Sequence, residues 1–179
     1  MLKIKVESNE FWDSDKEEFV YIKGGVLQLE HSLLSLSKWE SNWGKAFMSD
    51  KEKTYDETID YIRCMTINKN VDPNVYYNLS ADDIRKINAY IENPMTATRF
   101  LSHDDNRINN ETVTSELIYY WMVELGIPFE CQKWHLNRLI TLIKVINKKR
   151  GGGKMSKSDI MRNNKQINEM RKKKYNTKG

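Results

Sequence analysis

The first thirty residues alternate apolar with polar positions, which is the pattern of a half-buried strand. Residues 2–7 place Leu, Ile and Val between Lys and Glu. Two further runs, at 19–22 and 26–31, are rich in Val, Leu, Ile and Tyr and flank the pair Gly24-Gly25. We therefore predict a small antiparallel sheet at the N-terminus, with a hairpin turn at this double glycine.

From Ser32 onward the apolar spacing changes to three and four residues, which is typical of an amphipathic helix. Leu33, Leu36, Trp39 and Trp43 fall on one face of this predicted helix. Core packing is the favoured role of the two tryptophans. The alternative is an exposed groove for a partner, since a four-residue spacing also brings them side by side.

Capping residues mark the starts of the next helices. Thr54 and Glu57 form a capping box, and Asp72 precedes a proline at the first position of a short turn. Ser80 begins another helix, which an Asn-Pro pair ends. The predicted apolar faces are Ile59, Ile62, Cys64 and Met65 in the first of these helices, and Ile84, Ile87, Tyr90 and Ile91 in the last.

Two strongly apolar helices are predicted after a polar loop. The first begins at Thr112 or Thr114 and runs to Leu125, where Gly126 ends it. The second spans about 130–149, and the short connection predicts an antiparallel helical hairpin. The predicted fold class is therefore α+β and mostly α: a small N-terminal antiparallel β-sheet followed by a helical bundle.

Charge divides the chain into two parts. Residues 148–179 contain twelve Lys or Arg and two acids, whereas the preceding residues contain 17 basic and 23 acidic side chains. A triple glycine at 151–153 marks the change. We predict a globular domain over 1–149 and a basic linker and amphipathic tail over 150–179. A helix at 157–173 is marginal alone and is expected to fold on a partner.

The residue types that commonly carry out catalysis or bind metals are scattered along the chain. His31, His103, His135, Cys64 and Cys131 lack the spacing of a zinc site. Cys131 precedes His135 by four residues, which places both on one face of the predicted helix, but a buried thiol is favoured there over a nucleophile. We therefore expect no enzyme activity, no cofactor and no metal. No stretch is apolar enough to cross a bilayer.

The basic tail predicts an interaction surface rather than a catalytic one. It would bind nucleic acid without sequence preference, but its single aromatic residue, Tyr175, offers no stacking platform. An acidic protein partner is therefore favoured. The candidate partner-binding residues are Ile160, Ile167 and Met170 for apolar docking and Arg171, Lys172, Lys173 and Lys174 for acidic groups, with Trp39 and Trp43 as the alternative groove.

Five stretches of the chain carry a resemblance to known proteins: LEHSLLSLSKWES at 29–41, DYIRCMTI at 60–67, LIYYWM at 117–122, IPFECQKWHLNRL at 127–139 and NEMRKKKYNTKG at 168–179. Together they resemble a family of tail assembly chaperones of tailed bacteriophages, encoded beside the tape-measure gene.

The resemblance implies a non-enzymatic protein of the host cytoplasm that binds the tape-measure protein and delivers it to tail-tube subunits. Self-association is a separate partner hypothesis, which the sequence leaves open. A virion structural protein of the tail or neck is the first alternative. A nucleic-acid-binding protein is the second.

Overall fold

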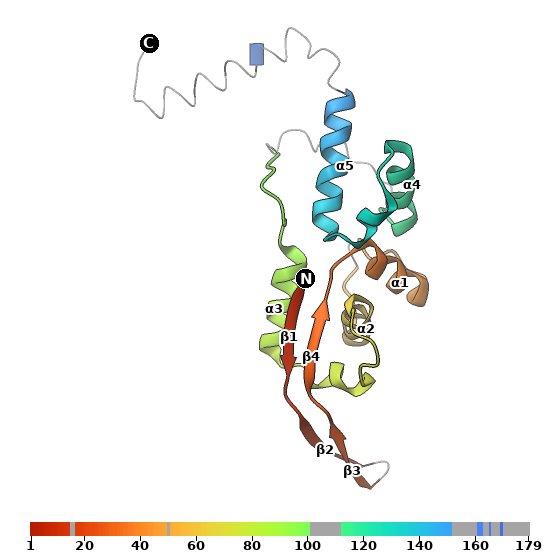
Figure 1. Ribbon diagram of the computed structural model, residues 1–179, viewed down its shortest axis with the longest axis vertical. Helices are drawn as coiled ribbons and strands as arrows, with labels where there is room; N and C mark the ends of the chain where they lie inside the picture. Colours follow the sequence, from red (N-terminus) through yellow and green to blue (C-terminus); the bar gives the residue numbers. More distant parts are fainter. Residues whose placement is uncertain are drawn as a thin grey trace. The chain divides into compact units, whose positions relative to one another are not determined.

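The computed structural model describes residues 1–14, 17–49, 51–100 and 112–151, together with 161, 162, 165 and 169. The chain divides into two units, Met1–Ile143 and Lys144–Gly179, each considered by itself. The described part is mostly helical, with antiparallel strands at its N-terminus (Figure 1), which confirms the predicted fold class. No helix among the described residues is long and apolar enough to span a membrane.

Four short strands form one long antiparallel ribbon. Leu2 lies opposite Leu29 and Asn9 lies opposite Ile22, so the same register runs through both pairs of strands. The ribbon is interrupted only around Ser8 and Gly24. The strands are β1 (Leu2–Val6) paired with β4 (Gly25–Leu29), and β2 (Asn9–Asp13) paired with β3 (Glu18–Ile22).

The predicted hairpin turn at Gly24-Gly25 is wrong. The chain turns between Asp13 and Glu18, where Glu17 has a left-handed φ of 53°. Gly24 instead lies within the ribbon, where a Cβ atom would stand 2.4 Å from the carbonyl oxygen of Val6. Glycine is needed at position 24 because two backbone segments meet there, not because the chain reverses.

The helices begin where the capping residues predicted. Ser32, Thr54, Asp72, Ser80 and Thr114 each accept a backbone N–H of the helix that follows, which satisfies a donor that the helix itself leaves unpaired. The elements are α1 (Leu33–Trp43), α2 (Tyr55–Met65), the 3₁₀ helix η1 (Pro73–Asn78), α3 (Ala81–Glu92), α4 (Ser115–Leu125), the 3₁₀ helix η2 (Phe129–Lys133) and α5 (Leu136–Gly151).

The last helix begins later than the sequence predicted. His135 pairs with Ser32 in an isolated β-bridge, and the N–H of Leu136 donates to the carbonyl oxygen of His31 at 2.7 Å. This tertiary pairing holds the chain extended between η2 and α5. The predicted helical hairpin is therefore only partly right: both helices exist, but η2 and the extended link separate them, and α4 packs against α1.

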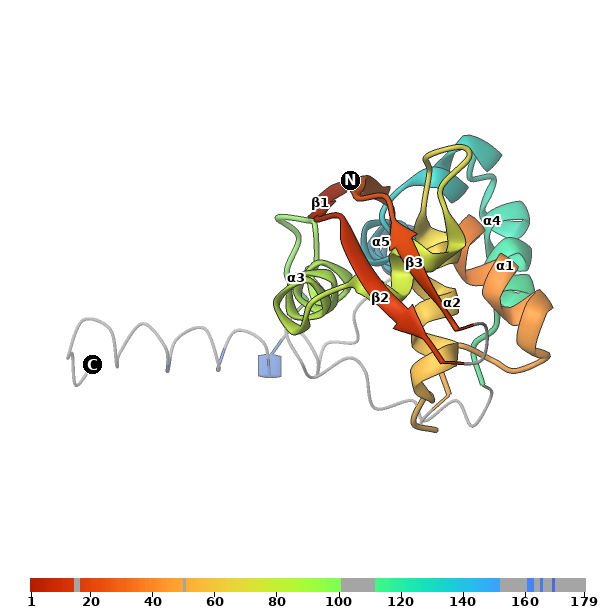
Figure 2. The same cartoon turned by 90° about the horizontal axis from the view of Figure 1, so that it is seen from below.

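One main core joins the ribbon to the helices. Its side chains come from β1, β3, β4, α1, α2, η1 and α3, whose arrangement is seen from below in Figure 2. Burying each large apolar side chain contributes about 1.5–3 kcal/mol. The most deeply buried members are Ile4, Leu27, Leu29, Trp39, Ile59, Ile62, Met65 and Ile87, each at 2% exposure or less.

The outer edge of β4 is closed by the segment that follows α2. The N–H of Ile67 donates to the carbonyl oxygen of Gln28 at 2.8 Å. The Asn68 amide continues the pairing: its Oδ1 accepts from the N–H of Gln28 at 2.6 Å, and its Nδ2 donates to the carbonyl oxygen of Val26 at 3.1 Å. The fold therefore covers the β4 edge with backbone and side-chain groups.

Candidate interaction surface

The β2–β3 half of the ribbon exposes four aromatic side chains. Phe11 is 42% exposed, Trp12 50%, Phe19 66% and Tyr21 62%. Figure 1 shows these two strands at the lower end of the ribbon, beyond the helices that cover β1 and β4. Clusters of exposed aromatic side chains are more common at binding surfaces than on the rest of a protein surface.

The register assigns three of these aromatics to one outward face. Paired residues of an antiparallel ribbon share a face, and alternate residues do as well. Trp12 pairs with Phe19, and Tyr21 is two residues beyond Phe19, so these three lie together. The Trp12 and Phe19 rings meet edge to face, with centroids 5.0 Å apart. Ile22 is on the opposite face and is 4% exposed, so that face is turned toward the core.

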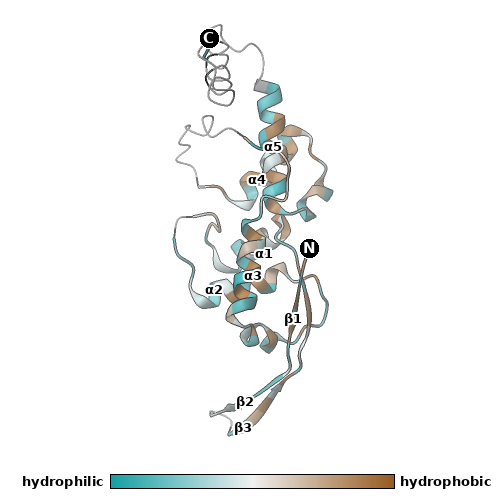
Figure 3. Cartoon of the chain, turned by 90° about the vertical axis from the view of Figure 1, so that its left-hand side faces the viewer, coloured by the Kyte–Doolittle hydropathy of each residue, from teal (hydrophilic) through white to brown (hydrophobic). Residues whose placement is uncertain are grey.

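The base of this half-ribbon is fixed to η1. The side chain of Asn9 donates to Asn78 Oδ1 at 2.9 Å, and Asn78 Nδ2 donates to the carbonyl oxygen of Glu7 at 2.8 Å. Buried Ile22 adds an apolar anchor to these hydrogen bonds. These contacts fix the base of the β2–β3 hairpin to the rest of the fold, while its far end projects into solvent. Figure 3 shows the apolar character of β3.

Both outer edges of β2–β3 are open. Among the described residues, neither strand pairs with a third one, in contrast to the covered edge of β4. An open edge offers backbone N–H and C=O groups to an added strand. The sequence from Asn9 to Ile22 also contains five acids and one lysine. Glu10 pairs with Tyr21 and is exposed, so its carboxylate lies on the same outward face. We call Trp12, Phe19 and Tyr21, with Glu10, the aromatic tip.

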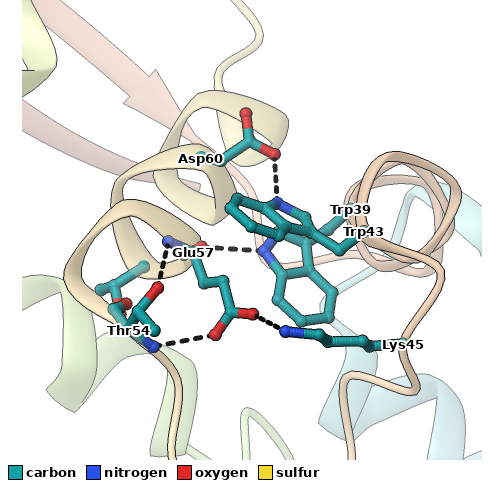
Figure 4. A network of polar contacts seen from close by, with 7 residues as sticks. Trp39, Trp43, Lys45, Thr54, Glu57 and Asp60 are labelled. Carbon is teal, nitrogen blue, oxygen red and sulfur yellow. Dashed lines mark hydrogen bonds and ion pairs between the residues drawn. The ribbon is translucent and has the colours of Figure 1, made fainter.

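Trp39 and Trp43 do not form an exposed groove. Trp39 is 1% exposed, and its indole N–H donates to the carbonyl oxygen of Glu57 at 2.8 Å. Trp43 is half-buried, and its N–H donates to Asp60 Oδ2 at 2.9 Å (Figure 4). The groove alternative is therefore wrong for Trp39, whose favoured role in the core is observed.

The network of Figure 4 closes around the Glu57 carboxylate. One oxygen pairs with the Lys45 ammonium, and the other accepts the backbone N–H of Thr54 at 2.8 Å. These contacts, the Lys45 hydrogen bond foremost, lower the pKa of the Glu57 carboxyl. The network joins α1 to α2 and so holds the two helices together.

The predicted tail residues lie outside the described residues. This holds for Ile160, Ile167, Met170, Arg171, Lys172, Lys173 and Lys174. Their part in binding stays a prediction.

Two histidines form a buried pair that the sequence did not reveal. His31 is 3% and His135 5% exposed, and their ring centroids are 5.0 Å apart. His31 Nδ1 lies 2.6 Å from the Tyr61 hydroxyl, and His135 Nε2 donates to the carbonyl oxygen of Tyr90 at 3.0 Å. Burial lowers the pKa of His31 to about 3 and also lowers the pKa of His135. Both imidazoles are thus held neutral inside the core.

The cysteines are not arranged for nucleophilic catalysis. Burial, followed by the charge of Asp60, raises the pKa of the Cys64 thiol to about 11, so the thiolate is rare at neutral pH. Cys131 is 6% exposed and lies in η2, whereas His135 lies beyond it in the extended link. The predicted shared helix face is therefore wrong. Within the described ranges, no three His, Cys, Asp or Glu side chains gather as metal ligands.

Helix α4 carries a second, smaller exposed apolar pair. Tyr120 is 59% and Val123 64% exposed, at the three-residue spacing of one helix face. Exposed Glu116 and Glu124 flank Tyr120 at four-residue spacing, so this pair also has acidic neighbours, but it lies on a helix and offers no strand edge. It provides a matched control surface.

Comparison with known proteins finds no matching family model, no similar curated protein and no similar solved structure. What the protein binds is therefore inferred from its own surface chemistry and from the sequence resemblance.

Proposed function

We propose that this protein is a non-enzymatic assembly factor that binds an unassembled protein through its aromatic tip and its basic C-terminal segment. The observation that carries the proposal is the outward face of Trp12, Phe19 and Tyr21 on a ribbon with two open edges. Such a surface combines apolar contact with backbone pairing, the two interactions used in strand addition.

In its specific form, the proposal makes the protein a tail assembly chaperone whose client is the tape-measure protein of a tailed phage. The sequence resemblance supports this choice of client. A long client with repeated apolar stripes needs cover until the tail tube encloses it. Many copies bound along one client would raise the effective concentration of each contact.

The acidic residues of the ribbon favour a protein client over nucleic acid at this surface. Residues 9–22 carry five acids against one lysine, and phosphate groups would be repelled there. Binding of nucleic acid would be left to the C-terminal segment alone.

The test follows the protein during infection. Quantitative mass spectrometry would compare its copy number in infected-cell lysate and in purified virions, and affinity capture from the lysate would identify what accompanies it. We expect abundance in lysate, absence from virions and recovery of the tape-measure protein. A fixed copy number in virions would make it a structural component of the tail or neck instead.

A further inference from the structure

When no client is present, association of the aromatic tip with another surface is favoured over its exposure to water, because burial of apolar area is favourable. A second copy of the same ribbon is a poor cover. Two tips meeting through their outward faces would bring Glu10 of one copy close to Glu10 of the other. Because residues 9–22 carry five acids against one lysine, the two ribbons would also repel each other.

A cover for this surface has to be basic and partly apolar. The chain contains such a segment: residues 154–179 hold nine Lys or Arg, two acids and several Ile and Met side chains. Its ammonium and guanidinium groups complement Glu10 and the net negative charge of residues 9–22. They are also suited to the faces of the Trp12 and Phe19 rings, which attract cations.

We propose that the aromatic tip of one copy binds residues 154–179 of a second copy, so that the protein self-associates head to tail before it meets its client. This inference rests on the proposed function in one respect, that the aromatic tip is the partner-binding surface. Because each copy has one tip and one basic segment, the contact joins two different surfaces and builds open chains or closed rings. It also leaves the tip covered until a client displaces the neighbour.

The experiment measures the mass of the full chain by sedimentation equilibrium after nuclease treatment, at about 50 mM and 500 mM salt. A ribbon variant carries Trp12→Ala and Phe19→Ala, which removes the aromatic rings and keeps the acidic character of the strands. A tail variant carries Lys172→Glu, Lys173→Glu and Lys174→Glu. We expect wild type to form concentration-dependent oligomers at low salt that dissociate at high salt, because exposed charge pairs are screened.

Each variant alone is expected to be monomeric, and a mixture of the two is expected to form a one-to-one dimer and nothing larger. The intact tip of the tail variant binds the intact segment of the ribbon variant, and both remaining surfaces are disabled. A control variant reverses the exposed Lys3, Lys51 and Lys69 to Glu and should oligomerise like wild type.

Wild type that stays monomeric at low salt, oligomers that persist in the ribbon variant, or a mixture that fails to pair would each overturn the head-to-tail contact. None of these results touches client binding, which is measured separately with the tape-measure protein. If instead the self-association is found and client binding is absent, the proposed function fails while this contact stands.

Discussion

The buried His31 gives the protein a defined sensitivity to acid. Its imidazole is neutral in the folded state because burial lowers its pKa to about 3, and the neighbouring His135 adds to this effect. In the unfolded chain the pKa returns to about 6.5. Below that value the unfolded chain binds a proton that the folded protein excludes, so stability is complete above about pH 6.5 and falls as the pH decreases toward 3.

The size of the loss follows from the two pKa values. At pH 5 the solution is about 1.5 pH units below the unfolded pKa, and each unit is worth about 1.4 kcal/mol, so His31 alone costs about 2 kcal/mol relative to neutral pH. Because the pKa of His135 is also lowered, its contribution has the same sign.

The assay is the free energy of unfolding from denaturant titrations between pH 5 and 7.5. The comparison variant is His31→Asn, which keeps a polar group near the Tyr61 hydroxyl and has no proton to gain. Taking the difference in unfolding free energy between wild type and variant removes the contribution of the other titrating groups. We expect wild type to lose about 2 kcal/mol relative to the variant between pH 7.5 and 5. Parallel curves over this range would refute a buried neutral His31.

Three further predictions test the packing. Gly24→Ala should destabilise the fold by about 1–3 kcal/mol, because its Cβ would overlap backbone atoms, whereas Gly25→Ala, which meets nothing within 4 Å, should change stability by less than about 0.5 kcal/mol. Trp39→Ala should cost about 3–5 kcal/mol in the same titrations, since it empties a buried site. Glu40→Ala should cost about 2–4 kcal/mol, because the Glu40 carboxylate accepts two backbone N–H groups, at 2.8 and 2.7 Å. Equal stability of the two glycine variants, or a neutral Trp39 or Glu40 variant, would contradict the packing described.

Helix starts could be predicted from the sequence because capping is local chemistry. Thr54 and Glu57 cap α2 through contacts three residues apart, so their spacing alone carries the information. The start of α5 could not be found in this way. It depends on the bridge between His135 and Ser32, which the sequence separates by about a hundred residues.

The ribbon shows the same limit. Gly24 resembles a turn residue, but its role comes from a close approach to Val6 across the ribbon, which no local pattern reveals. Strand β2 could not be predicted for a related reason. Phe11 and Trp12 are adjacent, so they lie on opposite faces of the ribbon, and the strand lacks a clean alternation of apolar and polar residues. The residues of the aromatic tip are brought together by the strand register, which pairs Trp12 with Phe19 and cannot be read from the local sequence.

The central claim is that the aromatic tip binds the client, and one co-expression measurement tests it most directly. The soluble fraction of the tape-measure protein from the same genome would be measured beside wild type, a Trp12→Ala/Phe19→Ala variant and a Tyr120→Ala/Val123→Ala control. We predict that wild type and control keep the client soluble. The ribbon variant is expected to fold but to leave the client insoluble. A ribbon variant that protects the client as well as wild type does would contradict the claim.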